Sequence, residues 1–255
     1  MELSLTNIVT ALLTIGVRVT GLMLFAPFFG SVAIPPRIKA ALVLTFTALL
    51  YSVFSPRIVP VDAIHWLVLV ISELTIGVVI GLATNLVFDA VQMAGQVLSV
   101  QMGYSLINIL DPQTQVDSTV VSLFHQSIAM LIFLRLDVHH WLLRAIANSF
   151  QYMPPGSAHI NILLTGEALR TGARVFAIGL QIAAPVLSAT LVADIVIGLL
   201  GKASAQLPLL LLGPALKSIL GLTIMIAALK YWPDLFQRLF LNSMVQAERL
   251  FHLAG

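Results

Sequence analysis

The feature that most constrains this chain is a series of long apolar runs separated by proline, glycine and polar residues. A helix needs about 20 apolar residues to cross a bilayer core about 30 Å thick. Because 59% of the residues are hydrophobic and 9% are charged, far from the balance of a soluble domain, the sequence predicts an all-α, polytopic membrane protein. We expect residues 1–255 to form one domain, with about six hydrophobic helical segments at approximately 8–29, 38–54, 64–88, 119–134, 174–200 and 205–229.

Two further helices are predicted from amphipathic patterns. One lies between the fourth and fifth apolar runs, and the other is the tail at about 234–253. Helices of this kind rest on a membrane surface or dock against a partner, and the pattern leaves both possibilities open. The apolar residues that define the first of them recur at helical spacing and are Trp141, Leu142, Ile146 and Phe150.

Prolines are expected to interrupt the helices at several places. Pro35 and Pro36 separate the first two apolar runs and indicate a helical hairpin. Later in the chain, breaks are expected at Pro185, Pro208 and Pro214, so the sequence does not predict six simple membrane spans.

Several classes of function find little support in the composition. The chain has no cysteine and a net charge of +2, so it offers no thiolate and no strongly basic surface for a nucleic acid. His139 and His140 are adjacent and are expected to diverge on a helix, so no metal site is predicted. Capping and solvation at a membrane boundary account for Asp137. We therefore predict neither an enzyme nor a cofactor.

Arg18 lies in the middle of the first apolar run, where a charged side chain costs at least about 2.5 kcal/mol. A carboxylate should compensate it, and the candidates are Glu73, Asp89 and Asp194. A buried structural ion pair is the favoured interpretation. The alternative is a stand-alone secondary transporter or small channel, in which Arg18, Glu73 and Asp194 would form a substrate or proton path.

Gly77 and Gly81 form a pair of small residues four positions apart within the third apolar run. Because glycine has no side chain to separate two backbones, this spacing allows a neighbouring helix to approach closely. We predict a packing role for both residues.

The stretch AGQVLSVQMGYSLINILDPQTQVDS, residues 94–118, is rich in amides and hydroxyls and has no lysine or arginine. Gly95, Gly103 and Pro112 are expected to break regular structure there. Irregular backbone at membrane depth is tolerated where it is buried in protein or lines a water-filled cavity. The stretch is therefore either the lining of a path or an ordinary solvated loop.

The run RVTGLMLFAPFFGSVAIPPRIK, which begins at Arg18, resembles the amino-terminal pattern of the FliR and SctT family of type III export proteins. The likeness continues through AGQ, QMG, LDVHHWLL, NSFQYMPPG, APVLSATLVADIVIGLL and GPALKSILGL, in that order and over nearly the whole chain. One departure follows the fifth run, where Lys202 and Ala205 stand in place of the usual arginine and proline. Arginine and lysine differ in hydrogen-bond geometry, so a bidentate contact is not expected at Lys202.

The resemblance implies a subunit of the type III protein export gate in the bacterial inner membrane, at a flagellar basal body or a secretion-system export apparatus. The family subunit looks like a FliP-like part fused to a FliQ-like helical hairpin. It assembles with FliP-like and FliQ-like subunits into a helical pore for unfolded protein substrates. FlhB-like and FlhA-like components are further implied partners, with membrane lipid around the assembly.

The resemblance also implies a role for the amide-rich stretch. In the family, a loop at the corresponding place acts as a plug at the pore constriction, and on this chain it falls at about 106–122. A weakly charged segment can close a lumen without holding an unfolded substrate by charge. The candidate plug residues are Gly103, Leu106, Ile107, Asn108, Ile109, Leu110, Asp111, Pro112, Gln113 and Ser118.

Overall fold

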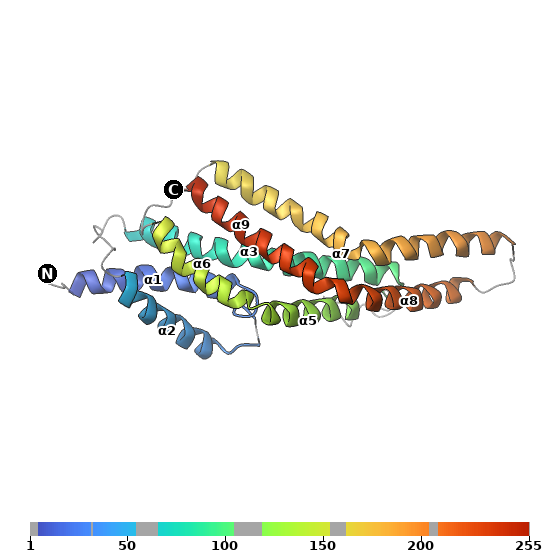
Figure 1. Cartoon of the computed structure of the whole chain (residues 1–255), viewed down its shortest axis with the longest axis horizontal. Helices are drawn as coiled ribbons and strands as arrows, with labels where there is room; N and C mark the ends of the chain where they lie inside the picture. The colour runs from blue at the N-terminus through green and yellow to red at the C-terminus, as the bar shows by residue number, and fades with distance from the viewer. Residues whose placement is uncertain are drawn as a thin grey trace. The chain divides into compact units, whose positions relative to one another are not determined.

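The chain folds into helices throughout the part that the structure, a computed structural model, describes: residues 5–31, 33–54, 66–104, 119–153, 162–203 and 209–254. Five helical segments in these ranges are long and apolar enough to cross a membrane, or up to six if α5 and α6 together form one span. The prediction of an all-α, polytopic membrane protein is therefore confirmed. The elements, shown in Figure 1, are α1 (Leu5–Phe25), α2 (Pro36–Phe54), α3 (Trp66–Gln101), α5 (Val120–Arg135), α6 (Val138–Tyr152), α7 (Ile162–Ala203), α8 (Leu209–Ala228), the 3-10 helix η3 (Leu229–Tyr231) and α9 (Trp232–Ala254).

The connection between α1 and α2 forms the predicted helical hairpin. Pro36 is the first residue of α2, a position where the missing backbone N–H costs nothing. In the turn before it, Phe28 adopts a left-handed conformation with φ 70°. Lys39 donates a hydrogen bond of 3.0 Å from its Nζ to the carbonyl of Gly30, which ties the start of α2 to the turn.

Three residues that were expected to break helices lie inside them. Pro185 is within α7 and Pro214 is within α8, so these two predictions are wrong. Prolines are tolerated in membrane helices because neighbouring groups satisfy the freed backbone atoms. Gly95 lies within α3, where a Cβ would be 2.4 Å from the Cα of Ser122 on α5. Glycine at this position therefore permits close packing, whereas the predicted break at Pro208 lies outside the described residues.

Two helices are longer than one hydrocarbon thickness. At a rise of 1.5 Å per residue, the 36 residues of α3 extend about 54 Å and the 42 residues of α7 about 63 Å. A bilayer core is about 30 Å thick. Neither helix can therefore be a simple perpendicular span over its full length. The sequence placed α3 at about 64–88 and missed its continuation to Gln101 because Gly95 was interpreted as a break.

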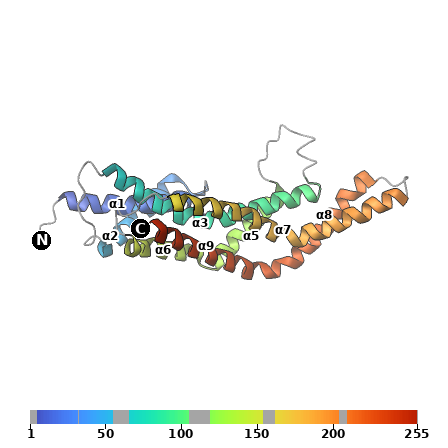
Figure 2. The same ribbon diagram turned by 90° about the horizontal axis from the view of Figure 1, so that it is seen from above.

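The chain divides into two compact units, and several helices contribute to both. We call them unit 1 and unit 2 and describe each by itself. Unit 1 comprises Met1–Leu86, Leu134–Gly172 and Leu239–Gly255, and unit 2 comprises Val87–Phe133 and Ala173–Arg238. The hairpin of α1 and α2 lies in unit 1, whereas α8 lies in unit 2 and follows the unit 2 part of α7 (Figures 1 and 2).

The core of unit 1 combines residues of α1, α3, α6 and α9. Phe54 at the end of α2 stacks on Phe150 of α6, with 5.3 Å between ring centroids. Fully buried apolar side chains fill the space between these helices. They lie there because the apolar face of each helix packs against the neighbouring helices. They include Ile15, Leu22, Met23, Ile80, Leu142 and Phe240.

The core of unit 2 has its own aromatic contacts. Phe88 of α3 meets Phe133 of α5 edge to face, with 5.7 Å between centroids. On the same helix α5, His125 lies 4.9 Å from the ring of Trp232 at the start of α9. The predicted amphipathic tail, at about 234–253, lies within α9, and the first turn of this helix packs through Trp232 and Phe236, both of which are buried.

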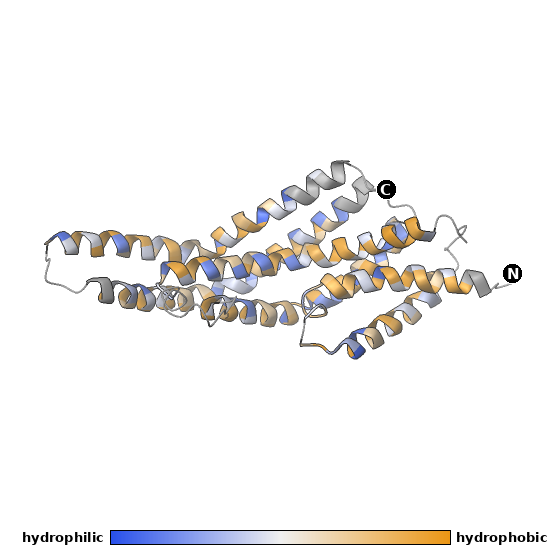
Figure 3. Cartoon of the chain, turned by 180° about the vertical axis from the view of Figure 1, so that it is seen from behind, coloured by the Kyte–Doolittle hydropathy of each residue, from blue (hydrophilic) through white to orange (hydrophobic). Residues whose placement is uncertain are grey.

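Large apolar side chains also remain on the outside of the molecule. Figure 3 shows hydrophobic residues along most of the helices, with polar bands at intervals. In unit 2, α7 and α8 expose many large apolar side chains. Soluble monomeric proteins rarely expose large contiguous apolar patches. The most exposed of these side chains on α7 and α8 are Phe176, Ile195, Leu199, Ile219 and Ile226. These faces need lipid or protein partners.

Candidate functional site

The most completely enclosed charged group in the described residues is Arg18, in the middle of α1. Its side chain is 0% exposed, and so is that of Glu73 on α3. The Nε of Arg18 donates to Oε2 of Glu73 over 2.6 Å. Of the three carboxylates that the sequence offered as partners, the structure brings Glu73 to Arg18. Asp89 is exposed on α3, and Asp194 has other partners.

Close backbone packing of α1 and α3 makes this ion pair possible. A Cβ at Gly77 would lie 2.1 Å from the carbonyl oxygen of Arg18, and a Cβ at Gly21 would lie 2.7 Å from the carbonyl oxygen of Leu74. At Gly81 a Cβ would be 2.9 Å from the backbone nitrogen of Ala26. Real Cβ atoms do not occupy such positions. Glycines on both helices therefore hold the two backbones at a separation that no larger residue permits.

Helix α6 supplies the remaining groups around the guanidinium. Arg18 donates from Nη1 to Oγ of Ser149 over 3.0 Å and from Nη2 to the carbonyl of Met153 over 3.2 Å. The ring of Phe150 lies under the guanidinium, 4.0 Å from its central carbon. The sequence analysis assigned no role to Ser149 or Met153, and it predicted Phe150 only on the apolar face of an amphipathic helix.

The Arg18 cluster joins three helices of unit 1 and is closed to solvent. Charged hydrogen bonds and a cation–π contact offset the cost of burying the guanidinium. Because removal of one partner would leave the other charge buried and uncompensated, each helix depends on the position of the other two. The arrangement can fix the packing of α1, α3 and α6. In this conformation, no substrate can reach the two charges.

A second polar cluster lies in unit 2 and is partly open. Asp194 of α7 accepts a hydrogen bond of 2.8 Å from Nε2 of Gln101, at the end of α3. Its other carboxylate oxygen lies 2.9 Å from Nζ of Lys217 on α8. The side chain of Asp194 is 42% exposed and that of Lys217 is 18% exposed. Asp194 and Lys217 are therefore partly accessible from outside the chain.

The end of α3 is held firmly against α8 within unit 2. Oγ of Ser218 donates to the carbonyl of Met102 over 3.0 Å. Gly103 follows with φ 87°, a conformation that favours glycine, and its Cβ position would be 2.9 Å from Cβ of Pro214. The predicted helix break therefore occurs at Gly103.

Gly103 is the first of the predicted plug residues and the only one among them that the structure describes. The range predicted for the plug ends in the first turn of α5, where Ser122 is fully buried against Gly95 of α3. The described residues that precede and follow residues 105–118 belong to unit 2. The other plug candidates lie outside the described residues: Leu106, Ile107, Asn108, Ile109, Leu110, Asp111, Pro112, Gln113 and Ser118.

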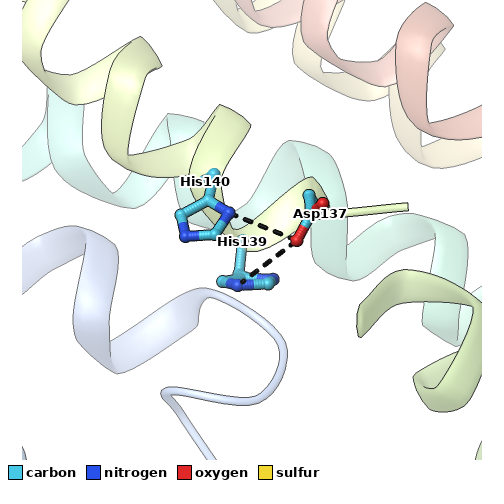
Figure 4. Close-up of side chains that lie close together, drawn as sticks. All are labelled: Asp137, His139 and His140. Carbon is cyan, nitrogen blue, oxygen red and sulfur yellow. Dashed lines mark ion pairs between the residues drawn. The ribbon is translucent and has the colours of Figure 1, made fainter. Parts of the chain in front are cut away.

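Asp137, His139 and His140 gather at the start of α6 in unit 1 (Figure 4). The imidazole centroids are 4.1 Å apart, so the expectation that adjacent histidines diverge is wrong here. Rotamers that clash with a preceding helical turn are open in the first turn of a helix, so neighbouring side chains can converge there. The carboxylate of Asp137 makes no capping hydrogen bond and instead faces the two rings.

Comparison with known proteins gives a consistent result. The model of the family described as "Bacterial export proteins, family 1" matches residues 9–243. The chain is 27% identical to flagellar biosynthetic protein FliR of Escherichia coli K12, over 88% of this chain and 85% of that one. It is 25% identical to the FliR of Bacillus subtilis 168, over 99% and 98% of the two chains. The FliR of Aquifex aeolicus VF5 is 29% identical over 83% of this chain and 82% of its own.

Proposed function

The chain belongs to the bacterial export proteins, family 1, and from that premise we propose that it is a subunit of a type III protein export gate. The gate lies in the bacterial inner membrane and passes unfolded substrates, which for the FliR relatives points to flagellar components. The observation that carries this proposal is the family match, which spans residues 9–243 and therefore both units of the molecule.

The exposed faces of unit 2 support an assembly with other helical subunits. Apolar residues on α7 and α8, such as Ile195 at 64% exposed and Ile219 at 67%, need a cover of protein or lipid. The partly open charges of Asp194 and Lys217 lie on the same two helices. A helix pair that carries both an apolar face and a polar cluster suits contact with FliP-like and FliQ-like neighbours around a wet pore.

The segment at 106–118 is the proposed plug of this pore. Its flanks support the assignment, because α3 is fixed to α8 through Met102 and Ser218, and α5 begins against Gly95. A segment attached to rigid ends can close a pore and open it without disturbing the subunit. Its amides and lack of lysine and arginine suit passage of unfolded chains of any charge.

The plug is tested by replacing residues 106–118 with a glycine and serine segment of equal length. In cells that make this chain as their only copy, we expect the replacement to raise ion leakage across the membrane or to alter substrate export. A matched control replaces residues 55–65, another connection, in the same way. Both variants are first checked for recovery of the assembled complex by affinity purification.

An assembled complex with normal leakage and normal export after replacement of 106–118 would show that this segment is not a plug. Deletion of the whole chain addresses the wider proposal. Cells without it should secrete no substrate of the apparatus, and unchanged secretion would contradict the function itself.

The stand-alone transporter remains the alternative. It requires substrate or protons to reach Arg18 and Glu73, and the full burial of both side chains argues against such access in this conformation. Asp194, the third residue of that hypothesis, belongs to unit 2 and pairs with Lys217. A transporter would move its substrate after reconstitution of this chain alone in vesicles, whereas a gate subunit would not.

A further inference from the structure

A cluster of possible metal ligands at the start of α6 lies outside both the Arg18 cluster and the proposed plug. Oδ1 of Asp137 is 3.3 Å from Nδ1 of His140 and 4.0 Å from Nε2 of His139. One ligand atom from each residue lies within 4.8 Å of the other two. The geometry points to a binding site for a divalent cation that prefers imidazole, of which Zn²⁺ is the representative, held by Asp137, His139 and His140 (Figure 4).

The spacing of the donors fits such a cation. In a tetrahedral site with metal–ligand bonds of about 2.1 Å, neighbouring ligand atoms are about 3.4 Å apart. The carboxylate oxygen of Asp137 and the nitrogen of His140 already have this separation. The distance between Asp137 and His139 is 4.0 Å, and all three ligand atoms lie within 4.8 Å of one another. The donors therefore need to close in by no more than about 1.4 Å to reach tetrahedral spacing.

The backbone of Asp137 supports a role other than capping. Asp137 occupies the N-cap of α6, where an aspartate usually accepts a hydrogen bond from the first turn with its side chain. Here its φ is 54°, in the left-handed region, and its side chain makes no capping bond. Its carbonyl accepts hydrogen bonds from the backbone N–H groups of His140 and Trp141, as the carbonyl of an N-cap residue ordinarily does. The left-handed conformation leaves the carboxylate free to face the two histidines.

The donor set selects the kind of metal. Two imidazoles and one carboxylate suit Zn²⁺ and its neighbours in the first transition row, whereas Mg²⁺ and Ca²⁺ prefer oxygen ligands alone. Three protein ligands leave a fourth position open to water or to a group of another molecule. The side chains of Asp137 and His140 are 65% and 59% exposed, so a cation can enter from solvent.

A bound cation would connect three residues of one helical turn. The same helix carries Ser149 and Phe150 to the Arg18 cluster, and all of these residues belong to unit 1. Fixing the start of α6 would therefore stabilise the helix on which the buried cluster depends. This inference stands apart from the proposed function, because it rests only on the three side chains and their geometry.

Cobalt provides the direct test, because Co²⁺ binds to zinc-type sites and gives visible absorption bands. The full chain is purified in detergent, with any subunits that accompany it, through an affinity tag that contains no histidine. We expect saturable binding of one Co²⁺ per chain and loss of the bands when Zn²⁺ is added. The variants His139→Ala and His140→Ala should each weaken binding at least about tenfold.

Asp137→Asn is the most conservative variant, since asparagine tolerates the left-handed conformation and removes only the charge. It should weaken Co²⁺ binding without loss of helix, which circular dichroism checks. The control replaces His65 and His159 with alanine, which removes the same number of histidines from elsewhere in the chain. The site would be refuted by wild-type protein that binds no stoichiometric Co²⁺, or by a His139→Ala, His140→Ala double variant that binds as wild type.

Discussion

The two units of this protein each contain an ion pair, and the two pairs differ in their exposure to solvent. In unit 1, Arg18 and Glu73 are 0% exposed, and their contacts join three helices. In unit 2, Asp194 and Lys217 form an ion pair of similar length, but their side chains are 42% and 18% exposed. The same chemistry therefore occurs once sealed inside protein and once with access to its surroundings.

Burial decides what each pair can contribute. A sealed pair contributes to architecture, because breaking it leaves a buried charge without its counter-charge. A partly exposed pair adds little to stability, because water and salt screen it, but it is available to a partner or a lumen. We therefore propose that the Arg18 cluster contributes to the folding of unit 1 and that the Asp194 cluster is available for contacts of unit 2 with other molecules.

The largest effect is expected from Arg18→Ala. Glu73 would remain buried without its cation, and the free energy of unfolding should fall by about 3–5 kcal/mol. The loss should appear as a lower denaturation midpoint in detergent and a lower yield of assembled complex. Arg37→Ala, which removes an exposed arginine from unit 1, is the matched control and should have little effect.

A double variant sharpens this test. Replacing Arg18 with Met and Glu73 with Leu removes both charges and keeps most of the volume. Apolar replacement of a buried ion pair is often neutral, so this double variant should be more stable than Arg18→Ala. If the double variant is as unstable as the single one, loss of packing, not an uncompensated charge, explains the defect.

An effect of intermediate size is expected from Gly77→Ala. The new methyl group would overlap the carbonyl of Arg18 and force α1 away from α3, which should cost about 1–3 kcal/mol or more. Gly198→Ala on α7 is the control, since no atom lies within 4 Å of its Cβ position. That variant should be neutral or stabilised by up to about 1 kcal/mol through helix propensity. Thermal unfolding of both variants in the same detergent measures the difference.

The smallest effect on stability is expected from Asp194→Asn. It should lower the free energy of unfolding by less than about 1 kcal/mol, because the ion pair with Lys217 is partly exposed. Its effect should appear in substrate export or in recovery of partner subunits. A stability loss as large as that of Arg18→Ala would remove the distinction between the two clusters.

The helices could be predicted from the sequence where apolar runs were long and ended in clear signals. Pro35 and Pro36 indicated the hairpin between α1 and α2, and the periodic apolar residues of α6 and α9 predicted both helices. The length of α3 could not be predicted, because Gly95 is needed for contact with Ser122, which is far away in sequence. Local composition does not distinguish a glycine that breaks a helix from one that packs against another.

The candidate sites were predictable only in part. The position of Arg18 within an apolar run predicted a buried charge with a carboxylate partner. The sequence contained three candidate carboxylates, and nothing in it distinguished among them. Ser149 and Met153 complete the cluster through contacts 131 and 135 residues away, and nothing in their local sequence marks them. The convergence of His139 and His140 depends on side-chain rotamers that are open in the first turn of α6, and a helical pattern does not reveal them.

The most direct test of the central claim is the mass of the particle that contains this chain. The chain is expressed with the neighbouring genes of its operon, purified through a tag at its carboxyl end, and analysed by native mass spectrometry in detergent. A gate subunit should appear in a large hetero-oligomer with several small helical membrane subunits. A lone monomer or homodimer, obtained although the neighbouring proteins are present, would contradict the export-gate account.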